Sequence, residues 1–253
     1  GFYFLGVAQA QSNQITSAKN SLVKSSELTP NWLAPREILA QLYAAAGDDS
    51  AAIEVSDVIL TANPKNEIAL MASASARIRK GELPKALDLL KRTKDVNPKN
   101  IAAYNDTAGI YALQKKLPQA LAEYEEVLTL SADHIVALGN IAQVYLMQGN
   151  PKAAFDRVER QLSLAKNKAP VYQLLGRLKL QAKEYQAAVK FAEQAIELDS
   201  NLSSAYEIIG SAYAAQKKYD AAFDQYQKLL QKTPKSIPTL MMVATLHELK
   251  GQR

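Results

Sequence analysis

The residue types that most often perform catalysis or bind metals are scarce in this sequence of 253 residues, which has two histidines and no cysteine. His247 lies in the segment "HELKG", which lacks the second histidine of the H-E-x-x-H zinc motif. His134 lies in a predicted loop without other metal-ligand types at suitable spacing. The acidic segment "GDDSAAIE" at 47–54 lacks the ligand spacing of a calcium loop. We therefore expect no enzymatic activity, no metal and no cofactor.

The charge balance bears on the class of partner. Lys and Arg number 30 against 25 Asp and Glu, and the formal net charge of +5 would permit nucleic-acid binding. The basic residues lie mainly at predicted turns, however, as in 115–116 and 217–218, and form neither a stripe nor a stacking platform. No apolar run is long enough to cross a membrane. We expect a protein or peptide partner, no nucleic acid and no membrane insertion.

A repeat of 34 residues predicts the elements that position any binding residues. Asn-Pro-Lys-Asn occurs at 63–66 and again at 97–100. One column at this spacing is alanine without exception: Ala18, Ala52, Ala86, Ala120, Ala154, Ala188 and Ala222. A second is always Gly or Ala: Gly6, Ala40, Ala74, Ala108, Ala142, Gly176, Gly210 and Ala244. A period of this size indicates a solenoid or a propeller.

The columns predict a pair of helices in each unit. With the Gly/Ala column as position 8 and the alanine column as position 20, positions 4, 8 and 11 share one helix face, as in Tyr104, Ala108 and Tyr111. Small residues at 8 and 20 allow two helix axes to approach closely. Prolines fall at helix starts or after helix ends, and Gly at position 15 marks the turn within the pair. Each unit therefore reads helix, turn, helix, loop.

This pattern resembles the tetratricopeptide repeat (TPR), which prefers Leu at 7, Gly or Ala at 8, Tyr at 11, Ala at 20 and Pro at 32. The resemblance implies an all-α, superhelical α-solenoid of 34-residue helix-turn-helix repeats. One array of residues 1–253 would comprise units 1–32, 33–66, 67–100, 101–134, 135–168, 169–202, 203–236 and a partial unit 237–253. Departures from the aromatic position 11, such as Arg77 and Lys179, are expected to loosen local packing.

The two ends suggest that the array continues. The segment "LMMVATL" near the C-terminus is too apolar for the outer face of a terminal repeat, so we expect the chain to be part of a longer one. An open first unit and an unpaired last helix would also allow end-to-end self-association.

In TPR proteins the first helices line a concave groove, and positions 5, 6 and 9 point into it. The Lys at 5 and Asn at 9 that chaperone adaptors use as a carboxylate clamp do not occur together in any unit. Units four to six instead place polar residues and two helix-interior glycines at these positions: Asn105, Gly109, Gly139, Asn140, Gln143, Gln173 and Arg177. Carboxamides can form hydrogen bonds with both the N–H and the C=O groups of a peptide backbone. Glycines leave space for that backbone to approach the helix. We expect an extended peptide here; the alternative is ordinary surface residues and tolerated glycines.

The resulting prediction is a non-catalytic protein-interaction scaffold. The Ala-, Lys- and Gln-rich texture is similar to that of bacterial TPR proteins of envelope exopolysaccharide export, including PEP-CTERM systems. That resemblance implies the periplasm or cell envelope, with the cytoplasm as the alternative. Two other functions stay open: a substrate-recruiting or regulatory domain of a larger enzyme, and a self-assembling scaffold.

Overall fold

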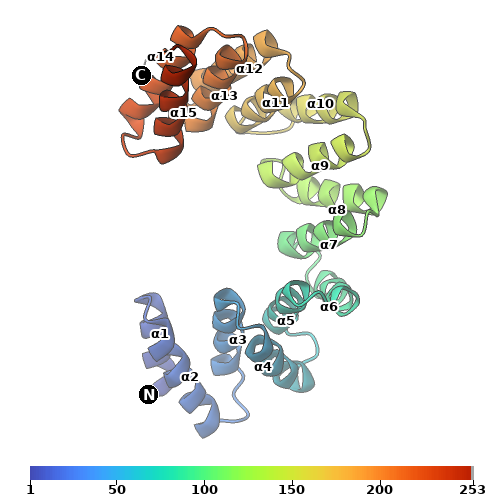
Figure 1. Cartoon of the computed structure of the whole chain (residues 1–253). Coiled ribbons are helices and arrows are strands. Elements are labelled where there is room, and N and C mark those ends of the chain that lie inside the picture. The colour runs from blue at the N-terminus through green and yellow to red at the C-terminus, as the bar shows by residue number, and fades with distance from the viewer. Residues whose placement is uncertain (252–253) are drawn as a thin grey trace. The chain divides into compact units, whose positions relative to one another are not determined.

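The computed structural model describes residues 1–251, and throughout them the chain is built from α-helices (Figure 1). Fifteen α-helices, one short 3-10 helix and no β-strand occur in this described part. The prediction of an all-α fold made of helix-turn-helix repeats is therefore confirmed.

The chain divides into two compact halves, Gly1–Glu126 and Val127–Arg253. The N-terminal half contains α1 (Phe2–Gln11), α2 (Ile15–Leu28), α3 (Ala34–Ala46), α4 (Asp49–Ala62), α5 (Glu67–Arg79), α6 (Leu83–Val96), α7 (Ile101–Leu113) and most of α8 (Leu117–Leu130). The C-terminal half contains α9 (Ile135–Met147), α10 (Pro151–Arg160), η1 (Gln161–Ser163), α11 (Ala169–Gln181), α12 (Tyr185–Leu198), α13 (Ser203–Ala215), α14 (Tyr219–Lys232) and α15 (Ile237–Leu249). Odd-numbered helices are the first helices of their units, and even-numbered helices are the second.

Small residues allow the two helices of a unit to pack closely. All seven alanines of the position-20 column have no exposed surface. A Cβ atom added to Gly210 would lie 2.7 Å from the ring of Tyr226, and one added to Gly176 would lie 3.2 Å from the backbone oxygen of Ala188. A side chain at either glycine would therefore have to displace the Tyr226 ring or press against the backbone of the second helix.

The turn within each pair uses one residue in the left-handed backbone region. At position 15 the glycines Gly47, Gly81, Gly149 and Gly251 have φ values of 75°, 74°, 72° and 70°. The units without glycine place Asn13, Lys115, Lys183 and Lys217 in the same region, with φ between 58° and 61°. The turn geometry is thus conserved between repeats even where the residue that favours it is absent.

The fifth unit departs from the regular pattern. Its second helix, α10, ends at Arg160 and continues as the 3-10 helix η1, although the uninterrupted period predicts a full-length helix. Gln161 is buried at position 27, where four other units bury an apolar residue and two bury the smaller polar residues Ser25 and Thr93. Its Oε1 accepts a hydrogen bond from Arg157 Nη1 at 2.9 Å, and its Nε2 donates to the Ala132 carbonyl at 2.5 Å. A buried amide needs these partners, and they hold the end of the helix in a tighter turn.

The repeated Asn-Pro-Lys-Asn sequence connects consecutive units. In its second copy, Asn97 Oδ1 accepts a hydrogen bond from the Lys99 backbone N–H at 3.0 Å, which closes a tight turn. Asn100 Oδ1 then caps α7 by accepting from the Ala103 backbone N–H at 2.9 Å. The side-chain amides of both asparagines donate to Glu67 Oε1, at 2.8 and 2.7 Å. The loop is thereby tied to the start of the preceding first helix.

Replacing Asn100 by Ala should lower the free energy of unfolding by about 1–2 kcal/mol, because α7 loses its N-cap. Urea unfolding followed by circular dichroism measures this change. Asn100→Ser is the matched control, since Ser236 caps α15 in the same way. Equal losses for Ser and Ala would show that the cap contributes nothing.

Candidate functional site

The residues predicted to bind a peptide lie on first helices in both halves. Asn105 and Gly109 belong to α7 in the N-terminal half. Gly139, Asn140 and Gln143 belong to α9, and Gln173 and Arg177 belong to α11, all in the C-terminal half. They therefore form two groups, one in each half.

The group in the C-terminal half lies on two helices that contact each other, α9 and α11. Gln173 and Arg177 are four residues apart and share one side of α11, as Gly139 and Gln143 share one side of α9. Gln143 and Arg177 are exposed, whereas Asn140 and Gln173 are half-buried. None of these four polar side chains makes a hydrogen bond or ion pair with another residue in 1–251. Their donors and acceptors are available to a ligand.

Packing does not require the glycines of the two groups. A Cβ atom added to Gly139 would meet nothing within 4 Å, and one added to Gly109 would meet only the Tyr124 hydroxyl at 4.0 Å. These positions differ from Gly210, where a Cβ would collide with a tyrosine ring. Gly139 and Gly109 therefore leave their helix backbone accessible at a cost in helix stability.

The group in the N-terminal half contains two polar side chains that are poorly solvated. Burial raises the pKa of the Asp106 carboxyl above its ordinary value, and a hydrogen bond from the Asn105 side chain partly offsets this rise. The Oδ1 atom of Asn105 is buried and has no hydrogen-bond partner among residues 1–251. An incoming N–H or O–H group could pair with this acceptor only if the Asn105 side chain turned outward, because the oxygen is closed off from solvent.

Two hollows lie between neighbouring first helices. One, of about 520 Å³, lies between α3 and α5 and is lined by Gln41, Ala44, Glu67, Ile68, Met71, Ala72 and Ser75. The other, of about 150 Å³, is lined by Glu207, Ser211, Tyr226, Pro238, Thr239 and Met242, from α13, α14 and α15. Burial raises the pKa of the Tyr226 hydroxyl, whose oxygen lies 3.2 Å from Ser211 Oγ. The sequence analysis did not predict either hollow. The small and polar residues at positions 5 and 9 of these units could have indicated them.

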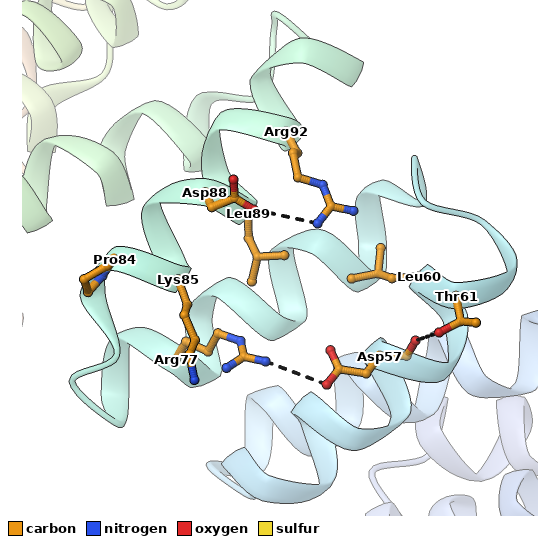
Figure 2. A pocket seen from close by; sticks show the side chains of 9 residues that line it. All are labelled: Asp57, Leu60, Thr61, Arg77, Pro84, Lys85, Asp88, Leu89 and Arg92. Carbon is orange, nitrogen blue, oxygen red and sulfur yellow. Dashed lines mark hydrogen bonds and ion pairs between the residues drawn. The ribbon is translucent and has the colours of Figure 1, made fainter.

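A larger hollow, of about 660 Å³, lies beside Arg77 among α4, α5 and α6 (Figure 2). Arg77 occupies position 11, where four other units have tyrosine. Its Nη1 atom lies 2.6 Å from Glu82 Oε2 and its Nη2 atom 3.7 Å from Asp57 Oδ2. Arg92 likewise pairs with Asp88 at 3.8 Å. The charges around this hollow therefore neutralise one another largely within the chain.

The histidines have structural contacts. His134 is the N-cap of α9, and its Nδ1 atom accepts a hydrogen bond from the Ala137 backbone N–H at 3.1 Å. The exposed ring of His247 lies edge-on to Phe223, with centroids 5.2 Å apart. Within residues 1–251, no three His, Asp or Glu side chains gather as metal ligands would, and no helix is both long and apolar enough to cross a membrane.

The two kinds of glycine predict opposite effects of substitution by alanine. Gly139→Ala should raise the free energy of unfolding by about 1 kcal/mol, because alanine favours the helix and its methyl group has space. Gly210→Ala should lower it by about 1–3 kcal/mol, because the methyl group displaces the Tyr226 ring. Chemical denaturation of both variants tests this contrast; a loss at both positions would refute the open surface at Gly139.

Asp106→Asn should stabilise the chain at pH 7. The folded chain binds this proton more tightly than the unfolded chain, so ionisation of Asp106 destabilises the fold. The destabilisation is absent below the unfolded pKa of about 3.9, grows between that pH and the higher folded pKa, and is complete above the folded pKa. Urea unfolding at pH 7 and pH 3 should show a gain at pH 7 that is lost at pH 3. Asp95→Asn, at an exposed position of α6, is the control and should show no such dependence.

Comparisons with known proteins agree with the repeat architecture. Two family models described as tetratricopeptide repeat match residues 99–167 and 174–237, which together make up more than half of the chain. No curated protein shows significant sequence similarity to it.

Solved structures extend the likeness over nearly the whole chain. A tetratricopeptide repeat protein from Parabacteroides merdae has 17% identity and a TM-score of 0.64, with 97% of each chain covered. The C-terminal part of a TPR repeat-containing protein from Cytophaga hutchinsonii has 14% identity and a TM-score of 0.65, covering 95% of this chain and 99% of that one. The Pseudomonas aeruginosa pilF structure has 18% identity and a TM-score of 0.57, covering 87% and 97%. At these identities the likeness concerns the fold alone, and together with the sequence matches it leads to one conclusion: the chain belongs to the tetratricopeptide repeat family.

Proposed function

We propose that this chain is a non-catalytic scaffold that binds an extended segment of a protein on the first-helix side of its C-terminal half. Tetratricopeptide repeat proteins generally mediate protein–protein interactions, and their fold is generally a non-catalytic scaffold. The observation that carries the proposal is the open backbone at Gly139 beside the unpaired carboxamides of Asn140 and Gln143.

The chemistry of these groups suits a peptide backbone. Each carboxamide offers a donor and an acceptor, so Asn140, Gln143 and Gln173 can pair with the N–H and C=O groups of an extended chain. The missing side chain at Gly139 lets that chain approach the helix. Arg177 is exposed and presents a planar fork of donors to an acidic side chain or a terminal carboxylate of the segment.

The residues on α7 supply a second contact in the proposal. If the Asn105 side chain turns outward on binding, its unpaired Oδ1 atom would accept a hydrogen bond from a backbone N–H of the bound protein. Gly109 would again leave room for a main chain. An unpaired buried acceptor is unfavourable in the free protein, so pairing it on binding adds to affinity.

We place the bound protein in a bacterial envelope assembly for polysaccharide export. This part of the proposal rests on the resemblance in sequence texture described above.

A library of random linear peptides displayed on phage, selected against the whole chain, tests the peptide-binding proposal. Peptides that bind should lose affinity by at least about tenfold with Gly139→Arg, which fills the open surface, and with the double variant Asn140→Ala, Gln143→Ala. Isothermal titration calorimetry with the selected peptides measures the loss.

Lys190→Arg is the matched control, since it changes an exposed residue of the second helix α12. Circular dichroism should show unchanged helicity in all variants. A selection in which every peptide binds the Gly139→Arg variant as well as the wild type would remove this surface from the proposed function.

A further inference from the structure

A hollow in the C-terminal half has a mostly apolar surface, although half of its lining residues are polar or charged. It lies among α9, α10 and α11, has a volume of about 560 Å³, and is lined by Leu146, Pro151, Lys152, Phe155, Asp156, Leu178, Lys179, Gln181, Ala182 and Glu184. None of the residues proposed to bind a peptide backbone lines it. Its size is within the range of pockets that hold small ligands or single side chains.

The repeat itself indicates what this region usually contains. Position 11 is Tyr43, Tyr111, Tyr145 and Tyr213 in four units, but it is Lys179 in the sixth. In the next unit, Tyr213 packs against two apolar clusters, one that includes Ala188 and one that includes Ala222. The aromatic ring of Tyr213 thus fills space beside the second helices of two consecutive units.

Lys179 cannot fill the corresponding space in the sixth unit. Its ammonium lies 4.2 Å from the centre of the Phe155 ring and 2.7 Å from Glu184 Oε2. Both contacts hold the charged end at the edge of the hollow. Leu146, Phe155 and Leu178 are half-buried, and Phe155 also packs against another ring, with centroids 5.8 Å apart. The side of these residues that faces the hollow lacks the ring that position 11 supplies in the neighbouring unit.

We propose that this hollow receives an aromatic side chain of a protein partner, in place of the ring that position 11 supplies in other units. The inference uses the coarser part of the proposed function, that the chain binds proteins, and is independent of the peptide contacts on α9 and α11. Aromatic side chains are the most common anchors of protein interfaces when they enter a pocket of this kind.

The charges at the rim favour an uncharged ring over an anion or a cation. Lys179 pairs with Glu184 at 2.7 Å, and Lys152 pairs with Asp156 at 2.5 Å. Each lysine therefore already has its carboxylate. The ammonium of Lys179 lies over one aromatic face, that of Phe155, and an incoming ring would give it a second aromatic neighbour.

Binding of p-cresol, which has the side chain of tyrosine, tests the proposal without knowledge of the partner. Proton–nitrogen NMR spectra of the whole chain are recorded during titration with p-cresol. Saturable shifts in the millimolar range are expected at the amides of Leu178, Gln181 and Ala182, with intermolecular NOEs from the ring to the methyl groups of Leu146 and Leu178. Absence of these shifts and NOEs in the wild type would overturn the proposal whatever any variant does.

Lys179→Tyr should close the hollow from within. The variant is expected to lose the p-cresol shifts and to melt at a higher temperature than the wild type, because the new ring covers the apolar surface. Lys190→Tyr, which adds the same residue at an exposed position of α12, should keep p-cresol binding. Shifts that persist in Lys179→Tyr would place the probe elsewhere and refute the site.

The variants Gly139→Arg and Lys179→Tyr together separate this inference from the proposed function. Phage-selected peptides with an aromatic anchor should bind the wild type and Gly139→Arg but lose at least about tenfold in affinity for Lys179→Tyr. Peptides that read the α9 and α11 surface should show the opposite pattern. If p-cresol binds saturably but the phage selection yields no peptide, the result supports the hollow as a binding site and counts only against the proposed peptide-binding surface on α9 and α11.

Discussion

The close approach of two helices at positions 8 and 20 is the constraint on which the rest of the structure depends. Seven alanines have no exposed surface, and a Cβ atom added to Gly176 would lie 3.2 Å from the backbone oxygen of Ala188, so little room is left for larger side chains. Since this contact recurs every 34 residues, the direction of each helix pair is set by two small residues. The turn and the loop then only have to connect helices whose packing is already determined. This is why a lysine such as Lys115 can occupy the left-handed turn position: packing of the pair outweighs its strain.

The fold could be predicted from sequence because its determinants repeat, and features that occur once could not. The columns of small residues, the prolines and the turn glycines predict every helix pair in residues 1–251. The shortened α10 was not predicted, because burial of Gln161 depends on a carbonyl of Ala132, twenty-nine residues earlier. His134 caps α9 from position 34, the position that also caps α5, α7 and α15 in their units. A loop histidine has no such meaning in isolation.

The candidate sites were predictable to different extents for a similar reason. The sequence locates glycines within helices, but only the folded structure distinguishes their roles. At Gly139 a side chain would extend into open space, whereas at Gly210 it would collide with the Tyr226 ring. The buried oxygen of Asn105 depends on how α7 packs, which no spacing rule gives. The sequence identifies Arg77 and Lys179 as departures from a column in which four units have tyrosine. The hollows beside them could not be predicted, because they depend on which carboxylate each basic side chain pairs with in the folded chain.

The open glycine and the unfilled position 11 have one feature in common. In each case one unit lacks a side-chain group that other units have at the same position, and the folded chain is less stable as a result. A glycine in a helix costs about 1 kcal/mol relative to alanine, and an uncovered apolar surface forfeits dispersion contacts. A partner that covers the apolar surface recovers those contacts on binding. The open glycine instead gives a partner space, because its cost is one of backbone entropy that binding does not return. A solenoid can therefore concentrate recognition in a few units without altering the contact that holds each helix pair together, because positions 8 and 20 take no part in either omission.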